Sequence, residues 1–484
     1  MRRGPPRVMT FPRKRAKNLR GERATRSFSS RENHMFHMPS TGSFIAHRIK
    51  RPFIRFMEIE ASSALVLLGM TLTALIWANS PIGHTYGLIW NTPIAFSVGE
   101  EFRLSLTLGQ WVNDGLMAIF FFVVGMEIKR ELVLGQLSSR QKAMLPVAGA
   151  LGGMVVPAGI YLVFHLGQPT ESGWGVPMAT DIAFAVAALS LLGSRVTPGL
   201  RVFLLALAIA DDLGAVAVIA LFYTAELHLD SLGWAAVGCI VCFGLNKAGF
   251  RSFALYALVG AFIWFETHHS GIHATVAGVL LGFLTRTASD GDDDKETLAD
   301  VSRKAAEDLR HSLRRRDDPD PGGHHRNEAI RTLEVVGRLS LSPLDFLMHR
   351  LERWVAFGIM PVFALANAGV VFEAGMLDNA ESTNVAIAVF LGLVVGKPLG
   401  ISVFSYLAVR LGFASLPAGV NWSSLFATGM LAGIGFTVAL FITVLAFNEP
   451  AHIAGSKIGI LVGSLAATVI GLSILRRALP AKGY

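Results

Sequence analysis

The stretch Arg201–Thr224 reads RVFLLALAIADDLGAVAVIALFYT and carries two adjacent carboxylates, Asp211 and Asp212, inside an apolar run. About 20 apolar residues cross a bilayer as a helix, so the stretch predicts a membrane span with both acids near its midplane. An ionised carboxylate at that depth is costly unless it is paired or lies in a wet cavity. An ion pair that only locks helices together needs one acid, whereas two neighbouring acids repel. The pattern therefore favours a binding site for a small cation.

The composition is that of an integral membrane protein. Of the 484 residues, 52% are hydrophobic and only 16% are charged, against about 25% charged residues in soluble domains. The net charge of +8 comes from residues 1–55, which hold 15 Lys and Arg against two Glu, while the rest of the chain is net acidic. The basic residues thus form a terminal extension rather than a nucleic-acid-binding face, and we expect no nucleic-acid partner.

Apolar runs predict an all-α polytopic fold with about twelve transmembrane helices. Residues 167–175, 225–230, 268–270 and 373–383 contain no Lys or Arg, whereas the alternate connections are basic. The positive-inside rule therefore places both termini and the basic connections in the cytoplasm. The predicted spans are roughly 60–79, 109–128, 143–166, 176–192, 201–224, 231–248, 253–267, 271–286, 353–372, 384–408, 423–447 and 457–476.

The chain then divides into four parts. Residues 1–55 are a basic extension that we expect to be disordered, 56–286 hold spans one to eight, 287–352 form a polar cytoplasmic insert, and 353–484 hold spans nine to twelve and the C-terminus. The two membrane parts together make one transport domain. The acid-poor extension is compatible with a transit peptide, with a basic arm near anionic lipid, or with an over-long start.

The end of the insert has its own helical pattern. Leu344, Leu347, Leu351 and Trp354 recur at helical spacing and predict an amphipathic helix that leads into span nine.

Two spans are interrupted. Span four reads VPMATDIAFAVAALSLLG, in which Pro177, Thr180 and Asp181 break the apolar run. Proline removes a backbone donor and Thr-Asp caps helices, so a broken helix with extended backbone at membrane depth is expected. Span eleven has Gly429, Gly433 and Gly435 in its first half, which permit close packing or a break. Because the two segments occupy corresponding places in two halves, they indicate an inverted-repeat transporter.

Other polar residues in the spans are candidates for the same site. Lys397 lies deep in span ten and needs a carboxylate partner, for which Asp211, Asp212 and Asp181 are available. Asp114, in the outer part of span two, is a functional candidate. The cysteine pair of span six, Cys239 and Cys242, has no second pair or nearby His and is interpreted as core packing rather than as a zinc or redox site.

Several segments together resemble the NhaA-type family of bacterial sodium/proton antiporters, over about residues 56–478. That family is a standard example of inverted-repeat transporters, so the inverted-repeat architecture expected above and the resemblance to this family are not two independent arguments. The segments are DGLMAIFFFVVGMEIKREL (114–132), ATDIAFAVAALSLLGSRV (179–196), LALAIADDLGAVAVIALFYT (205–224), SGIHATVAGV (270–279), FALANAGV (363–370), GKPLGIS (396–402) and GIGFT (433–437).

The resemblance implies the fold and the roles of the site residues. Spans three to five and ten to twelve would be inverted repeats, with spans four and eleven broken and crossing. Asp211 and Asp212 would bind Na⁺ and protons. Asp181 with Thr180 would lie at the crossing, and Lys397 would balance helix-end charges or pair with Asp211.

The resemblance also suggests residues for ion entry and pH response. Asp114, Glu127 and Glu131 would line a cytoplasmic funnel. His273, at the outer start of span eight, has the side chain whose charge changes near neutral pH. Before span nine the family commonly has an acid and histidines; here Met348 replaces the acid, His349 remains, and Glu352 replaces a histidine.

The expected function is exchange of Na⁺, and of Li⁺, for protons across a bacterial inner (plasma) membrane by a multi-pass secondary transporter. Exchange would be electrogenic and pH-regulated and would serve Na⁺ and pH homeostasis. No cofactor is expected beyond the transported Na⁺, Li⁺ and H⁺, and the expected partners are membrane lipid and a second copy in a homodimer. The protein is not expected to be an enzyme.

Three other classes of membrane protein use buried acids and fit the sequence less well. A Na⁺- or H⁺-coupled symporter of a small solute is the main alternative, but it needs a polar or aromatic pocket beside the acids. An intramembrane aspartyl protease needs a G-x-G-D motif, which the sequence lacks. A channel would not need competing protonation.

Overall fold

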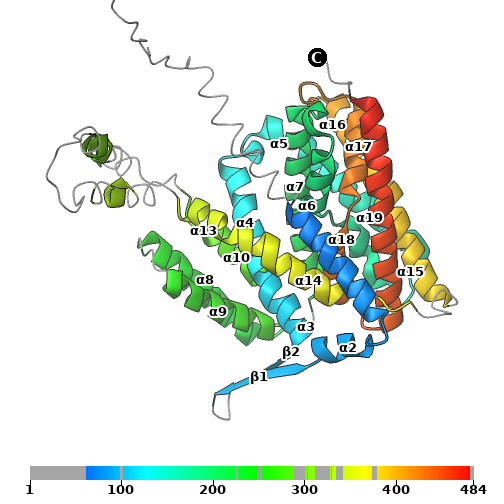
Figure 1. Cartoon of the computed structure of the whole chain (residues 1–484), viewed down its shortest axis with the longest axis horizontal. Coiled ribbons are helices and arrows are strands. Elements are labelled where there is room, and N and C mark those ends of the chain that lie inside the picture. The colour runs from blue at the N-terminus through cyan, green and yellow to red at the C-terminus, as the bar shows by residue number, and fades with distance from the viewer. Residues whose placement is uncertain are drawn as a thin grey trace, which may run out of the picture. The chain divides into compact units, whose positions relative to one another are not determined.

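A computed structural model describes residues 62–98, 102–224, 227–248, 250, 253–287, 300–301, 303–310, 328, 330–333, 342–372 and 379–479. These residues are mostly helical and belong to one unit, Phe53–Tyr484 (Figure 1). The predicted basic extension 1–55 and most of the insert lie outside the described residues.

The first half of the described chain contains ten helices and one strand pair. The helices are Ser62–Ala78, α2 (His84–Trp90), α3 (Leu108–Gln110), α4 (Met117–Val133), α5 (Arg140–His165), α6 (Ile182–Ser190), α7 (Pro198–Phe222), α8 (Leu229–Lys247), α9 (Phe253–His269) and α10 (Thr275–Leu284).

The second half holds α13 (Pro343–Trp354), α14 (Met360–Asn367), α15 (Ala380–Leu391), α16 (Lys397–Arg410), α17 (Trp422–Ala432), α18 (Phe436–Ala446) and α19 (Pro450–Ala478). Residues 300, 301 and 303–310 of the insert are also helical.

Six helices among the described residues are long and apolar enough to cross a membrane, or seven if α17 and α18 count as one bent span. Other predicted spans are shorter: α10 has ten residues, which rise only about 15 Å. A largely helical fold with apolar spans is therefore present, while the number twelve remains a prediction.

Two of the predicted spans contain a widened π turn where a proline enters. The turn Gly392–Gly396 joins α15 to α16 directly before Lys397 and Pro398, and the turn Val355–Ile359 joins α13 to α14 before Pro361. Proline lacks the backbone N–H and its ring clashes with the carbonyl four residues earlier, so the helix widens there. Lys397 consequently begins a new helical segment inside the span.

A β-hairpin lies between the first two predicted spans, where sequence reasoning placed no element. Strand β1 (Pro93–Val98) pairs antiparallel with β2 (Phe102–Thr107), with Pro93 opposite Thr107. The signal for β2 is its alternation, because Leu104 and Leu106 are buried two residues apart. The alternation covers only a few residues, so it is easily missed beside the long apolar runs of the predicted spans.

Glycines bring pairs of helices into backbone contact. A Cβ on Gly152 of α5 would lie 2.1 Å from the carbonyl oxygen of Gly400 on α16, and one on Gly400 would lie 2.0 Å from the carbonyl of Gly152. Gly396 also lies close to α5, because a Cβ there would lie 2.8 Å from Pro157 Cα. Small residues permit such close approach in membranes. The contact packs α16 directly against α5 and so sets the position of Lys397.

The amphipathic helix predicted before span nine is present as α13. Leu344 is fully buried, and Leu347 and Leu351 pack against the main core. Trp354 differs from the expectation: it lies at the edge of the apolar face, beside the π turn, and is 70% exposed.

Candidate functional site

Helix α7 carries the two acids at its centre. Its first turn is capped by Thr197, whose side chain accepts a hydrogen bond from Leu200 N, and Pro198 provides the preformed first position. The helix continues without a break for 25 residues, so both acids lie in the middle of a span. Asp211 is 2% exposed and Asp212 is 6% exposed.

Two interrupted segments meet beside these acids. A 3₁₀ segment, Glu171–Met178, is followed by extended backbone up to Asp181, where α6 begins. Helices α17 and α18 are bent by 48° at their break. Asp181 N donates to the carbonyl of Ile434 at 2.6 Å, and Thr180 Oγ1 donates to the carbonyl of Ala432 at 2.8 Å. The free backbone groups of one break are therefore satisfied by the other.

The Asp181 carboxylate caps both helices that start at these breaks. Its Oδ1 accepts from Phe184 N at 3.2 Å, and its Oδ2 accepts from both the backbone N and the hydroxyl of Thr437. A carboxylate at two helix N-termini offsets the positive ends of both dipoles. With both oxygens occupied, Asp181 serves the framework more directly than it serves a mobile ion.

Lys397 binds Asp211. Its Nζ lies 2.6 Å from Asp211 Oδ2 and 2.8 Å from Thr180 Oγ1, and its side chain is 1% exposed. Of the three candidate partners, the structure selects this one. The second oxygen, Asp211 Oδ1, is buried and has no hydrogen-bond partner within the described chain.

The carboxylate of Asp212 has mainly other acids around it. No hydrogen bond or ion pair with the described residues holds its carboxylate. The charges that act on it most strongly are those of Asp211, Glu127 on α4, and Asp181. Glu127 in turn feels the charges of Glu352 and Glu131. Glu352 of α13, Glu127 of α4 and Asp212 of α7 thus form a row of interacting acids that ends at the buried pair.

The remaining charges at this end of α4 have structural partners. Glu131 accepts from Gln136 N at 2.8 Å, and Gly135 leaves room for it, because a Cβ there would lie 2.0 Å from Glu131 Oε2. Lys129 Nζ donates to the carbonyls of Phe283 and Thr285 and so caps the end of α10.

Asp114 lies at the other end of the same span from Glu127 and Glu131. It belongs to the π turn Trp111–Leu116 before α4, and 13 residues of helix separate it from Glu127 by about 20 Å. Its carboxylate lies 3.3 Å from His273 Nε2 and 3.9 Å from His268 Nδ1. The structure therefore joins Asp114 to His273 and not to the other two proposed funnel residues.

The two candidates on α13 point in different directions. Glu352 is half-buried close to Glu127, whereas His349 is exposed. Met348, in the position of the family's acid, is half-buried against the main core.

Comparison with known proteins decides the family. The sequence model described as Na⁺/H⁺ antiporter 1 matches residues 54–475. The chain belongs to this family. Its apolar helices and this membership make it an integral membrane protein.

The relatives of this family member carry the same description. A protein of Rhodopirellula baltica named Na(+)/H(+) antiporter NhaA is 47% identical over 89% of this chain and 94% of its own length. Proteins of Myxococcus xanthus and Sorangium cellulosum named Na(+)/H(+) antiporter NhaA 2 are 48% and 45% identical, covering 88% and 90% of this chain and 89% and 92% of their own. Antiporters are transporters and not enzymes, and the resemblance found in the sequence is confirmed.

A solved structure, that of the sodium proton antiporter MjNhaP1 from Methanocaldococcus jannaschii, covers 88% of this chain and 98% of its own. At 13% identity and a TM-score of 0.46, this likeness carries no argument about fold or activity.

The sequence did not single out Thr437 and His268, which contact residues of the candidate site. Thr437 holds Asp181, and His268 lies beside Asp114. The signal for Thr437 is a hydroxyl residue two positions after Gly435 of the broken span, in the first turn of the helix that starts there. His268 has no comparable signal, since only the packing of α9 beside α10 brings it to Asp114.

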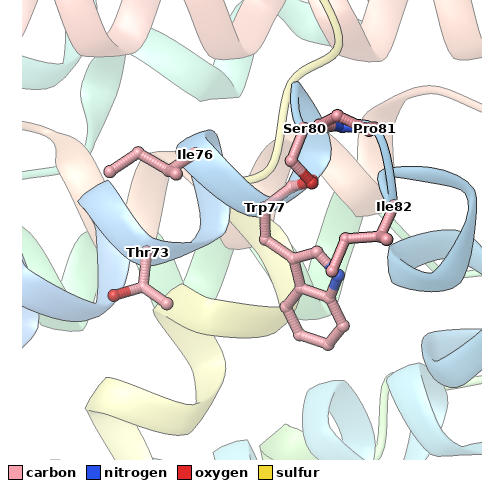
Figure 2. A pocket seen from close by; sticks show the side chains of 6 residues that line it. All are labelled: Thr73, Ile76, Trp77, Ser80, Pro81 and Ile82. Atoms are coloured by element: carbon pink, nitrogen blue, oxygen red, sulfur yellow. The ribbon is translucent and has the colours of Figure 1, made fainter.

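A surface hollow of this family member lies away from the acids. It is lined by Thr73, Ile76, Trp77, Ser80, Pro81 and Ile82, which come from the first described helix and the turn after it (Figure 2). None of these residues is ionisable, so the hollow offers no carboxylate ligand. Among the described residues, no group of three or more His, Cys, Asp or Glu is arranged to hold a metal.

Proposed function

We propose that this protein exchanges Na⁺, and also Li⁺, for protons across the bacterial inner membrane. The observation that carries the proposal is the buried contact between Lys397 and Asp211, next to Asp212, where two interrupted helices meet. Small hard cations prefer oxygen ligands, which two carboxylates and the nearby backbone carbonyls supply. The names of the relatives support the same activity.

Competition for the Asp211 carboxylate provides the exchange step. Its Oδ2 contacts the Lys397 ammonium at 2.6 Å, so a sodium ion that binds both acids would lie next to that charge. Two cations on one carboxylate repel strongly in a low dielectric. We infer that Lys397 releases its proton when sodium binds. Return of protons to Lys397 and Asp212 then expels the sodium ion.

The charges of the two loaded states lead to electrogenic exchange. With sodium bound, two carboxylates, one Na⁺ and a neutral Lys397 sum to minus one. With protons bound, the Asp211–Lys397 pair and a protonated Asp212 sum to zero. The states differ by two protons on one side and one sodium ion on the other, so each cycle moves one net charge.

The breaks in the two spans support alternating access. Extended backbone at membrane depth is tolerated where protein buries it or where it lines a cavity. In inverted-repeat transporters, such broken helices carry the ion site near the midplane and one repeat moves against the other. We propose twelve spans in this arrangement, with spans four and eleven crossing and both termini in the cytoplasm. We further propose that the protein forms a homodimer and that its activity is regulated by pH. It would serve Na⁺ and pH homeostasis and need no cofactor.

Purified full-length protein in liposomes tests this function. An inward sodium gradient should drive protons out, and a pH dye should report it without any added organic solute. Lithium should replace sodium and potassium should not. A membrane potential clamped with K⁺ and valinomycin should change the rate, because charge moves in each cycle. Proton flux that requires a solute would instead favour the symporter, which the names of the relatives do not support.

A further inference from the structure

Helix α13 has two faces of different chemistry. Leu344, Leu347 and Leu351 face the core. Because each residue turns the helix by about 100°, the exposed residues form one continuous stripe beside the apolar face. The outward stripe consists of Phe346, His349, Arg350, Arg353, Trp354 and, in the π turn that follows, Phe357, all of them exposed.

The acidic and the basic residues of α13 lie on different sides of the helix. Asp345 lies 3.4 Å from Arg130 of α4, and Glu352 lies close to Glu127 of the same helix. Both acids of α13 are thus directed towards α4. Within the described part of the chain, Arg350 and Arg353 have no ion-pair partner. The outward stripe is therefore basic and aromatic and contains no acid.

The order of residues along the stripe matches the order of groups in a phospholipid. The two arginines come first, Trp354 follows, and Phe357 lies about 10 Å from Arg350 along the axis, at the start of the apolar part of the span. In Figure 1, α13 runs on into α14. Arginine pairs with phosphate, and Trp favours the boundary between headgroups and chains. A soluble anion would use only the arginines and leave the aromatic side chains exposed.

We propose that the outward stripe of α13 binds an anionic phospholipid of the cytoplasmic leaflet. Arg350 and Arg353 hold the phosphate, and Trp354 and Phe357 pack against the upper part of an acyl chain. The inference depends on the proposed orientation of the membrane and not on sodium/proton exchange. Its consequence is that the helix that carries Glu352 beside Glu127 is anchored to the lipid surface on its other side.

Fluorescence quenching of Trp354 tests the lipid site in the intact protein. Detergent-solubilised protein is titrated with dibrominated phosphatidylglycerol or with dibrominated phosphatidylcholine. The difference between the parent and a Trp354→Phe variant isolates the signal of this residue from that of the other tryptophans. We expect the anionic lipid to quench Trp354 at about 30-fold lower concentration, as two basic side chains near the headgroups predict.

Charge variants decide whether the two arginines are responsible. The double variant Arg350→Gln/Arg353→Gln should lose the preference for the anionic lipid, whereas Arg350→Lys/Arg353→Lys should keep most of it. The control Arg476→Gln/Arg477→Gln, an exposed pair at the end of α19, should behave as the parent does. Melting temperatures establish that each variant is folded.

Three results would overturn the proposal. One is equal quenching of Trp354 by both lipids in the parent. Another is a preference that survives in the folded Arg350→Gln/Arg353→Gln variant. The third is full displacement of the lipid by millimolar inorganic phosphate, which would identify a simple anion site. The readout does not involve transport, so these outcomes are independent of the proposed exchange.

Discussion

Lys397 Nζ lies 2.6 Å from Asp211 Oδ2, and both side chains are almost completely buried, 1% and 2% exposed. The lysine comes from the start of α16 and the acid from the middle of α7, 186 residues earlier in the chain. Thr180, next to the break before α6, donates its hydroxyl to Ala432 and accepts from the same lysine. One ammonium group thus connects the acid on the unbroken helix to the crossing of the two broken segments.

Asp212→Asn should abolish sodium-driven proton flux and leave the fold intact. The amide keeps the shape of the side chain but cannot bind and release a proton, and it is a weaker cation ligand. Flux in liposomes and the melting temperature of purified protein provide the two readouts. The control is Asp230→Asn, an exposed acid at the start of α8, which should transport normally. Near-normal exchange by Asp212→Asn would remove Asp212 from the proposed site.

Lys397→Ala should destabilise the protein by about 3–5 kcal/mol, because it leaves Asp211 buried without its partner. Thermal unfolding of the purified variant measures this change. The double variant Lys397→Ala/Asp211→Asn should recover part of the stability, since it removes the uncompensated charge as well. Lys247→Ala, at an exposed position at the end of α8, provides the control. A single variant as stable as the parent would show that the contact contributes nothing.

Thr437→Val should lower the maximal transport rate and cost about 1–3 kcal/mol of stability, because Asp181 loses the hydroxyl that caps its carboxylate. Thr428→Val is the matched control: its hydroxyl is equally buried but bonds only to Ser424 within α17. Thr437→Ser, which keeps the hydroxyl, should restore most of the rate. If Thr428→Val and Thr437→Val slow transport equally, the effect belongs to helix packing in general.

Gly152→Ala should destabilise the protein, by about 1–3 kcal/mol or more, because the added methyl group would lie 2.1 Å from the carbonyl of Gly400. The same change at Gly159, on the same helix, meets nothing within 4 Å and should be neutral or slightly stabilising. Melting temperatures of the two variants compare them directly. Equal values would mean that α5 and α16 separate without cost.

Sodium and protons should compete for one site. The apparent Michaelis constant for Na⁺ should then rise steeply as pH falls, while the maximal rate at saturating Na⁺ changes far less. The reason is that sodium uses the lone pairs of Asp211 and Asp212, while the competing protons bind to Asp212 and to Lys397, the partner of Asp211. Ionisable groups this close titrate as a coupled unit. Rates over a sodium series at several fixed pH values, without a membrane potential, measure this. A Michaelis constant that does not change with pH would exclude competition and point to a sensor elsewhere, for which His349 and Glu352 are the candidates.

Local sequence predicted a good part of this site. Two acids in a run of 20 apolar residues, a lysine before a proline, and a Thr-Asp step after a proline each require a special environment in a membrane, and each lies in the site. The hairpin of β1 and β2 was missed because its alternation is short. The sequence placed Asp114 in the outer part of span two, but the resemblance grouped it with Glu127 and Glu131 in a cytoplasmic funnel; the structure puts it beside His273, at the other end of the span from those two acids.

The sequence by itself determined that this is a membrane protein, which family it belongs to and which polar residues are buried in the spans. It could do so because the length of an apolar run and the cost of a buried charge are properties of each segment alone. Only the tertiary structure decided that Lys397 pairs with Asp211 and not with Asp212 or Asp181. It also decided that Thr437 donates its hydroxyl hydrogen bond to Asp181. Pairing depends on the packing of α5, α7, α16 and α18 in three dimensions. Segments nearly two hundred residues apart meet there, and no local pattern encodes that distance.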